Sequence, residues 1–173
     1  MNVILLRTRL ATHDVDFFNA DLSPKDSVII RGATAFARKQ MQKACRIDLP
    51  ASWFNNQTTV FIKSSLRKTL TDEAIAQNEI VFRAQGLTIL AAPWPYALCS
   101  KIHRISGGHP RQYDASDAAN CLHRYLSCQR SREIRAQTIR QWGQRYEISI
   151  SDRDIAKVDD AYAQLYRSKA VRW

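Results

Sequence analysis

The chain has 173 residues, of which 45% are apolar and 24% are charged, with only five glycines and five prolines. This composition excludes a disordered, collagen-like or low-complexity chain, and it predicts one domain with a packed core, or one domain with a small appendage. The 26 Lys and Arg residues outnumber the 16 Asp and Glu residues by ten, so an anionic partner is expected. No apolar run approaches the ~20 residues that cross a bilayer, and no signal-peptide pattern is present. We therefore expect an intracellular, cytoplasmic protein without a membrane partner.

The first part of the chain is predicted to mix strands and helices. Residues 13–18 alternate polar and apolar side chains, which is typical of a short strand, and Asp14 and Asp16 then project from the same face. Ser23 and Pro24 indicate a helix start, with Ser as the N-cap. The expected helices cover 24–45 and 65–77, and a hairpin that turns at Gly86 joins strands at 79–83 and 87–92.

The later part of the chain is predicted to be helical. Apolar residues recur at helical spacing over 95–106, 115–129, 133–145 and 152–168. The predicted fold class is therefore α+β, with an α/β core over residues 1–110 and a helical region over residues 111–173 that packs on it. Cys99 and Cys121 fall within the apolar helical patterns, so we expect them to be buried free thiols.

Arginine residues gather late in the sequence. Residues 101–173 contain 14 basic and 8 acidic side chains, whereas residues 1–100 contain 12 and 8. On a helix, the late arginines would either lie along a phosphate backbone or form a solvated face. Nearby aromatic rings would either stack on RNA bases or pack in the core. The candidate nucleic-acid-binding residues are Arg124, Arg130, Arg132, Arg135, Arg140 and Arg145, and the aromatic residues are Tyr125, Trp142 and Tyr146.

The Asp-x-Asp pattern of Asp14 and Asp16 is the sharpest chemical feature. Two carboxylates on one strand face repel each other unless a cation lies between them. Oxygen ligands of this kind suit Mg²⁺, with water or phosphate oxygens in the remaining positions. Exposed strands also carry paired acids without any metal, so the pattern alone does not decide between the two interpretations.

Two separated stretches resemble the nucleotidyltransferase fold, in particular minimal nucleotidyltransferases and abortive-infection toxins. The first stretch is RLATHDVDFF, from Arg9 to Phe18. The second begins with the strand and helix of LTILAAPWPYALCSKI, which contain Lys101, and continues through Arg104 to the RQYDASD segment. The block from Trp53 to Asn56 is more loosely similar to uncharacterised fungal proteins with this fold.

The resemblance implies an Mg²⁺-dependent transfer of a nucleotide from an NTP to a hydroxyl or phosphate acceptor, with RNA or tRNA as one candidate acceptor. It makes Asp14 and Asp16 the catalytic metal ligands, and Glu79 is assigned as the third carboxylate by position only. Arg9, Lys101 and Arg104 are the implied nucleotide-binding residues. The alternative for Lys101 is an ion pair with Asp114 or Asp117. Both acids lie in the RQYDASD segment, and we expect them to have structural roles at a helix start.

The resemblance also identifies one departure from the family pattern. The family places a Gly-Gly or Gly-Ser turn before the Asp-x-Asp, and that position falls at or just before Met1. We therefore expect weakened Mg²⁺-nucleotide binding and a chain that is shortened at its start, because backbone amides at such a turn bind phosphate. The alternative functions are a catalytically inactive relative that binds nucleic acid or a protein, and a fungal tRNA-dependent cyclodipeptide synthase.

Overall fold

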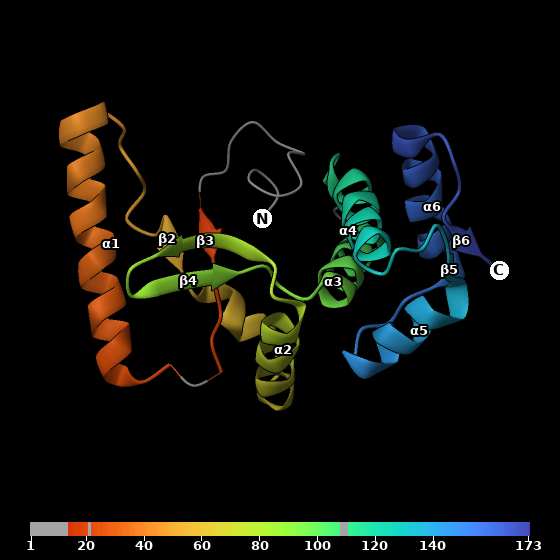
Figure 1. Ribbon diagram of the computed structural model, residues 1–173, viewed down its shortest axis with the longest axis horizontal. Coiled ribbons are helices and arrows are strands. Elements are labelled where there is room, and N and C mark those ends of the chain that lie inside the picture. Colours follow the sequence, from red (N-terminus) through yellow and green to blue (C-terminus); the bar gives the residue numbers. More distant parts are fainter. Residues whose placement is uncertain (1–13, 21, 108–110) are drawn as a thin grey trace. The chain divides into compact units, whose positions relative to one another are not determined.

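The computed structural model describes residues 14–20, 22–107 and 111–173. They belong to two compact units, which we call the N-terminal unit, ending at Glu73, and the C-terminal unit, Ala74–Trp173. Helices and two-stranded sheets occur in both units, as Figure 1 shows. The α+β class predicted from the sequence is therefore confirmed.

The N-terminal unit contains one long helix and a short parallel pair of strands. Its elements are β1 (Val15–Asp16), α1 (Pro24–Cys45), β2 (Phe54–Asn55), the 3-10 helix η1 (Gln57–Phe61) and most of α2 (Ser64–Gln77). The predicted helices over 24–45 and 65–77 are confirmed to within one residue.

Strand β1 pairs in parallel with β2, Val15 opposite Phe54 and Asp16 opposite Asn55. The Val15 amide donates to the Trp53 carbonyl at 2.6 Å, and the Phe17 amide donates to the Asn55 carbonyl at 2.9 Å. The Phe17 ring also stacks on the Phe54 ring, with centroids 4.6 Å apart. These contacts fix β1 through its backbone and through a half-buried aromatic pair.

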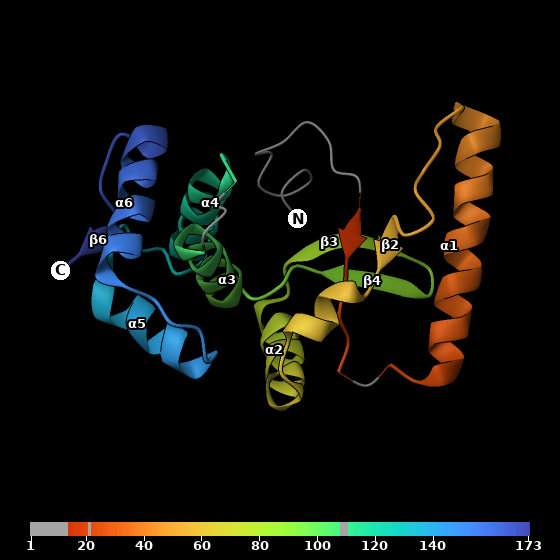
Figure 2. The ribbon, with the colours of Figure 1, turned by 180° about the vertical axis from the view of Figure 1, so that it is seen from behind.

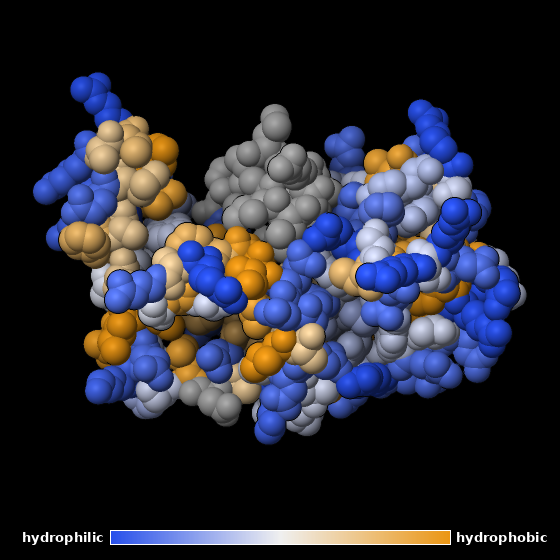
Figure 3. Space-filling view, viewed as in Figure 1, coloured by the Kyte–Doolittle hydropathy of each residue, from blue (hydrophilic) through white to orange (hydrophobic). Residues whose placement is uncertain are grey.

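Helix α1 begins as the sequence predicts. The Ser23 hydroxyl accepts the Asp26 amide at 3.1 Å, and Pro24 occupies the first helical position. Arg46, in the left-handed conformation with φ 53°, ends the helix. No residue of α1 is buried, and Phe36 is 64% exposed. Apolar atoms consequently appear on the surface of α1 in Figure 3.

The C-terminal unit consists of a hairpin, four helices and a second parallel strand pair. Gly86, with φ +81°, provides the left-handed turn residue that the sequence predicts between the hairpin strands. The elements are β3 (Ile80–Ala84), β4 (Leu87–Leu90), α3 (Trp94–Ser106), α4 (Asp114–Cys128), β5 (Ile134–Arg135), α5 (Ala136–Arg145), α6 (Asp152–Tyr166) and β6 (Val171–Arg172).

Helices α3, α4 and α6 enclose the core of the C-terminal unit. Helix α3 packs along α4, and α4 packs along α6, with α5 against α3 and α6. Trp94, Leu98, Leu122 and Ile155 are among the fully buried side chains at these contacts. The domain boundary that the sequence suggested falls between α3 and α4 in chain order, while the two compact units divide at residues 73 and 74.

The β5–β6 pair is a feature that the sequence did not predict. Ile134 pairs in parallel with Val171, and the two strands lie side by side from the front and from behind (Figure 1, Figure 2). The predicted helix over 133–145 was wrong at its start, because residues 134 and 135 are extended to pair with β6. The buried Asp159 of α6 accepts the amides of Ala170 at 2.8 Å and Val171 at 3.0 Å, which fastens β6 to α6.

Candidate functional site

The two aspartates of the Asp-x-Asp pattern lie in the N-terminal unit, Asp16 on β1 and Asp14 directly before it. Asp14 and Asp16 are exposed, whereas Val15 and Phe17 are half-buried. The exposure therefore alternates along the strand, as it does when every second side chain points toward solvent. The Phe17–Phe54 contact and the pairing with β2 set which side chains face outward.

The chemistry of this pair suits a hard divalent cation. Carboxylate oxygens are the ligands that Mg²⁺ prefers, and the ion usually keeps several waters or substrate phosphates alongside one or two carboxylates. Within residues 14–20, 22–107 and 111–173, no cluster of three or more His, Cys, Asp or Glu side chains is arranged to hold a metal. A cation at Asp14 and Asp16 would therefore have two protein carboxylates at most from this pattern.

Glu79 lies in the C-terminal unit, at the entrance to the hairpin, where its carbonyl accepts the Ala91 amide at 2.8 Å. Its carboxylate accepts a 2.6 Å hydrogen bond from the Arg124 guanidinium of α4. That guanidinium also lies over the Trp94 ring, 5.9 Å from the centroid. The structure therefore brings together a predicted catalytic acid and a predicted nucleic-acid-binding arginine, and each neutralises the other.

Lys101 and Arg104 take part in an internal ion-pair network. Lys101 Nζ lies 2.7 Å from the Asp117 carboxylate, and Arg104 lies 3.2 Å from Asp114. The Asp114 carboxylate also accepts the Arg111 amide at 2.9 Å. Both acids are almost completely buried, at 1% and 0% exposure, so their charges depend on these cations. The ion-pair alternative for Lys101 is what the geometry shows, and the structural roles expected for the two acids agree with it.

The late arginines are divided between α4, the segment that follows it and α5. The chain leaves α4 after Cys128 and forms a loop and strand β5 before α5 begins at Ala136, because Ile134 is drawn into the sheet with β6. Arg140 pairs with Asp152, and Arg145 lies over the Tyr146 ring. Of the six candidate nucleic-acid-binding arginines, Arg130, Arg132 and Arg135 are exposed and enter no recorded ion pair among the described residues. Arg9 lies outside the described residues.

The aromatic residues near these arginines belong to the core. Tyr146 is buried, while Tyr125 and Trp142 pack edge to face with centroids 4.7 Å apart. Cys99 and Cys121 are fully buried, as predicted. Burial raises the pKa of both thiols to about 12, so neither is a thiolate nucleophile at neutral pH.

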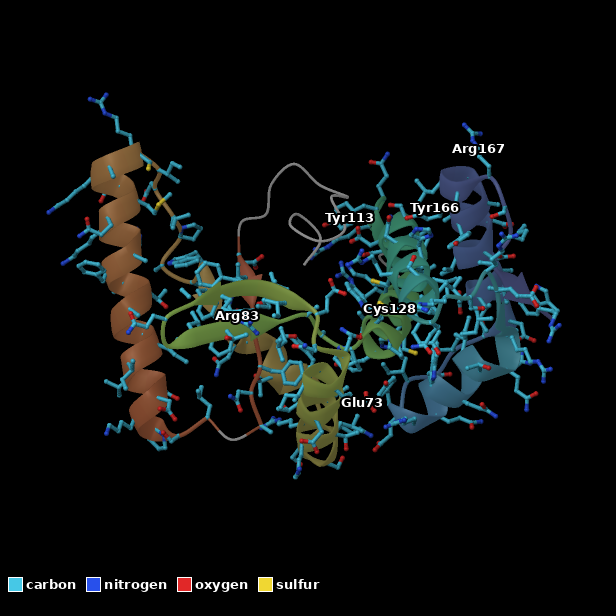
Figure 4. All side chains as sticks on the ribbon, viewed as in Figure 1. Glu73, Arg83, Tyr113, Cys128, Tyr166 and Arg167 are labelled. Atoms are coloured by element: carbon cyan, nitrogen blue, oxygen red, sulfur yellow. The ribbon has the colours of Figure 1, made fainter. Side chains whose placement is uncertain are left out.

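One group of polar side chains was not identified from the sequence. His123 of α4 bonds to the Tyr162 hydroxyl at 3.0 Å and stacks on the Tyr166 ring, with centroids 3.9 Å apart. Figure 4 labels Tyr166 on α6. Tyr162 and Tyr166 follow His123 by 39 and 43 positions, so no local motif connects them. Only the packing of α4 on α6 reveals this group.

Comparison with known proteins gives one match. A family model described as a domain of unknown function, DUF7582, matches residues 24–169. The chain belongs to this family. The DUF7582 match spans parts of both compact units, and Asp14 and Asp16 precede it. No curated protein and no solved structure matches the chain. None of the described helices of this DUF7582 chain combines the length and hydrophobicity that spanning a membrane requires.

Proposed function

We propose that the chain is a nucleotidyltransferase-like protein that binds an Mg²⁺–NTP complex through Asp14 and Asp16. The observation that carries the proposal is the exposure of both carboxylates at alternate positions, one directly before β1 and one on it, with the half-buried Val15 and Phe17 between and after them. The sequence resemblance around RLATHDVDFF supports the same assignment.

The proposed reaction is the attack of an acceptor hydroxyl or phosphate oxygen on the α-phosphorus of the NTP, with pyrophosphate leaving. Mg²⁺, when bound, would neutralise charge on the triphosphate and orient it. Asp14 and Asp16 supply the oxygen ligands. Lys101 and Arg104 contribute little to this proposal, because their charges already serve the buried Asp117 and Asp114.

Ligand-induced stabilisation tests the metal–nucleotide site. Mg²⁺ with an NTP at a hundred times its Kd should raise the free energy of unfolding by about 2.7 kcal/mol, measured as a rise in melting temperature. Asp14→Asn combined with Asp16→Asn should abolish the rise. The matched control is Asp48→Asn with Asp72→Asn, which removes two exposed carboxylates from the same unit and should leave the rise unchanged. If the parent protein shows no rise, the proposal is wrong.

A transfer assay then separates binding from catalysis. The parent protein is incubated with each α-³²P-labelled NTP, Mg²⁺ and total tRNA, and label on the RNA is measured after gel separation. Transfer that the Asp14 and Asp16 substitutions abolish supports an active enzyme. A stabilisation by Mg²⁺–NTP without any transfer to tRNA would favour a nucleotide-binding relative that lacks catalysis or uses another acceptor.

A second candidate function is RNA binding by a non-catalytic relative, and one observation favours it. Arg130, Arg132 and Arg135 are exposed and enter no recorded ion pair among the described residues. If all three contact phosphates, replacing them with Gln should reduce the slope of log affinity against log salt by about 2. Arg83, Arg153 and Arg167, also exposed, serve as the matched control set. An unchanged slope would exclude this surface as the RNA contact.

A further inference from the structure

The C-terminal unit contains a polar pocket where α4 and α6 end. Its volume is about 370 Å³. Its wall includes the end of α4, the loop that follows α4, and the segment between α6 and β6. The lining side chains that matter here are His123, Arg132, Tyr162, Ser168 and Lys169.

The His123 imidazole lines the pocket and contacts Tyr162 and Tyr166. Burial and the neighbouring Arg124 lower the pKa of His123, and burial with the Asp159 charge raises the pKa of Tyr162. Both groups are therefore uncharged at neutral pH. When the Tyr162 hydroxyl donates to His123 Nδ1 across their 3.0 Å contact, the imidazole carries its proton on Nε2, where it is a hydrogen-bond donor.

The cations around the pocket differ in how far they are neutralised. Lys169 is paired with Asp159 and Asp160, and Glu133, the carboxylate of the lining, is 3.3 Å from Arg172. Arg132 enters no recorded ion pair among the described residues. The Ser168 hydroxyl also has no recorded hydrogen bond within that part of the chain. The lining thus includes one unneutralised guanidinium, a hydroxyl and an imidazole.

We propose that this pocket binds a phosphate monoester group through Arg132, with Ser168 and His123 as further donors. A guanidinium presents paired N–H groups that match two phosphate oxygens, and hydroxyl and imidazole donors complete such sites. The phosphate comes either from a free nucleotide or from the 5′ end of an RNA. The pocket residues belong to the C-terminal unit, whereas Asp14 and Asp16 belong to the N-terminal unit.

An NMR titration with inorganic phosphate tests the proposal on the full chain. EDTA is present, so that no divalent metal contributes. Saturable shifts are expected at the amides of residues 131–133 and 168–169 and at the His123 ring. Arg132→Gln should weaken binding about tenfold, as loss of a charged hydrogen bond does. Ser168→Ala should weaken it by a smaller factor.

The controls separate this site from general basicity and from the proposed function. Arg153→Gln removes an exposed guanidinium of α6 outside the pocket and should leave phosphate affinity unchanged. The variant with Asp14→Asn and Asp16→Asn should also bind phosphate normally. No shifts at the pocket residues, or an equal loss in the Arg132 and Arg153 variants, would overturn the proposal.

Two further ligands identify the source of the phosphate. AMP that binds more weakly to Arg132→Gln than to the parent indicates a free nucleotide. A 5′-phosphorylated RNA oligonucleotide that binds more tightly than AMP and than its 5′-hydroxyl twin indicates an RNA end. Both results support the pocket. Equal affinity for the two oligonucleotides, with no response to Arg132→Gln, would refute it.

Discussion

Two glycines of the chain should respond in opposite directions to the same substitution. A Cβ at Gly143 of α5 would lie 2.7 Å from the Ile148 carbonyl oxygen and 3.0 Å from the Ile150 side chain. This turn is fixed, because the Ile148 amide donates to the Gly143 carbonyl at 2.8 Å. At Gly32 of α1, by contrast, an added Cβ would meet nothing within 4 Å.

The magnitudes follow from helix propensity and from overpacking. Ala in place of Gly within a helix gains about 1 kcal/mol. Gly32→Ala should therefore raise the free energy of unfolding by about that amount. At Gly143 the gain is opposed by an overpacking cost of about 1–3 kcal/mol, because the contact is with backbone. We expect Gly143→Ala to be destabilising by about 1 kcal/mol, so the two variants should differ by about 2 kcal/mol.

Urea unfolding provides the measurement. Circular dichroism reports on the helices, and tryptophan fluorescence, from Trp53 in one unit and Trp94, Trp142 and Trp173 in the other, adds a second probe. The free energy of unfolding is obtained for the transition that contains the substituted residue. If Gly143→Ala stabilises its unit as much as Gly32→Ala stabilises the other, the close approach of the Ile148 carbonyl to α5 does not exist in solution.

Three further predictions concern the cysteines, His123 and the buried Asp159. Ellman's reagent should react quickly with the two exposed thiols of the native chain and with all four thiols in urea. The other two thiols should be slow in the native chain, because burial raises their pKa to about 12. Four fast thiols in the native state would contradict the packing. His123 should titrate in ¹H NMR below the usual 6.5, so stability should be complete above about pH 6.5 and decline as the pH falls through the lower folded pKa. His123→Gln should reduce this decline, and equal pH profiles would refute the assignment. Asp159→Ala should lower the free energy of unfolding in urea by about 3 kcal/mol, because it leaves two amides of the β6 segment without their buried acceptor. Asp160→Ala, at an exposed neighbour, should lower it far less.

Most helices could be predicted from the sequence because their signals are local. Ser23 and Pro24 mark the start of α1, and Gly86 marks the hairpin turn, through preferences that act over a few residues. The burial of Cys99 and Cys121 followed from the apolar periodicity of α3 and α4. These features need no knowledge of distant parts of the chain.

The pairings between distant residues could not be predicted in this way. Ile134 is extended because it pairs with Val171, which lies 37 residues later in the chain. This pairing overrides the helical pattern of the sequence around Ile134. Arg124 faces Glu79, 45 residues earlier in the chain. Their opposite charges are visible in the sequence, but the packing that joins the hairpin entrance to α4 is not.

The same limit affects the candidate site. The Asp-x-Asp pattern indicated Asp14 and Asp16 directly, since alternation along a strand is a local property. The competing roles of Lys101 stayed open, because an ion pair and a phosphate contact require the same residue type. The geometry of Asp114 and Asp117 resolves which partners Lys101 has in the folded chain.

The distribution of thiols has a practical consequence. Cys45 ends α1 in the N-terminal unit, and Cys128 ends α4 in the C-terminal unit. Both are exposed, whereas the other two cysteines are buried in the core. The natural sequence therefore offers one attachment point for a spin label in each unit, without any engineered cysteine. Electron–electron double resonance between the two labels would give the distribution of distances between the units, with and without added Mg²⁺ and nucleotide.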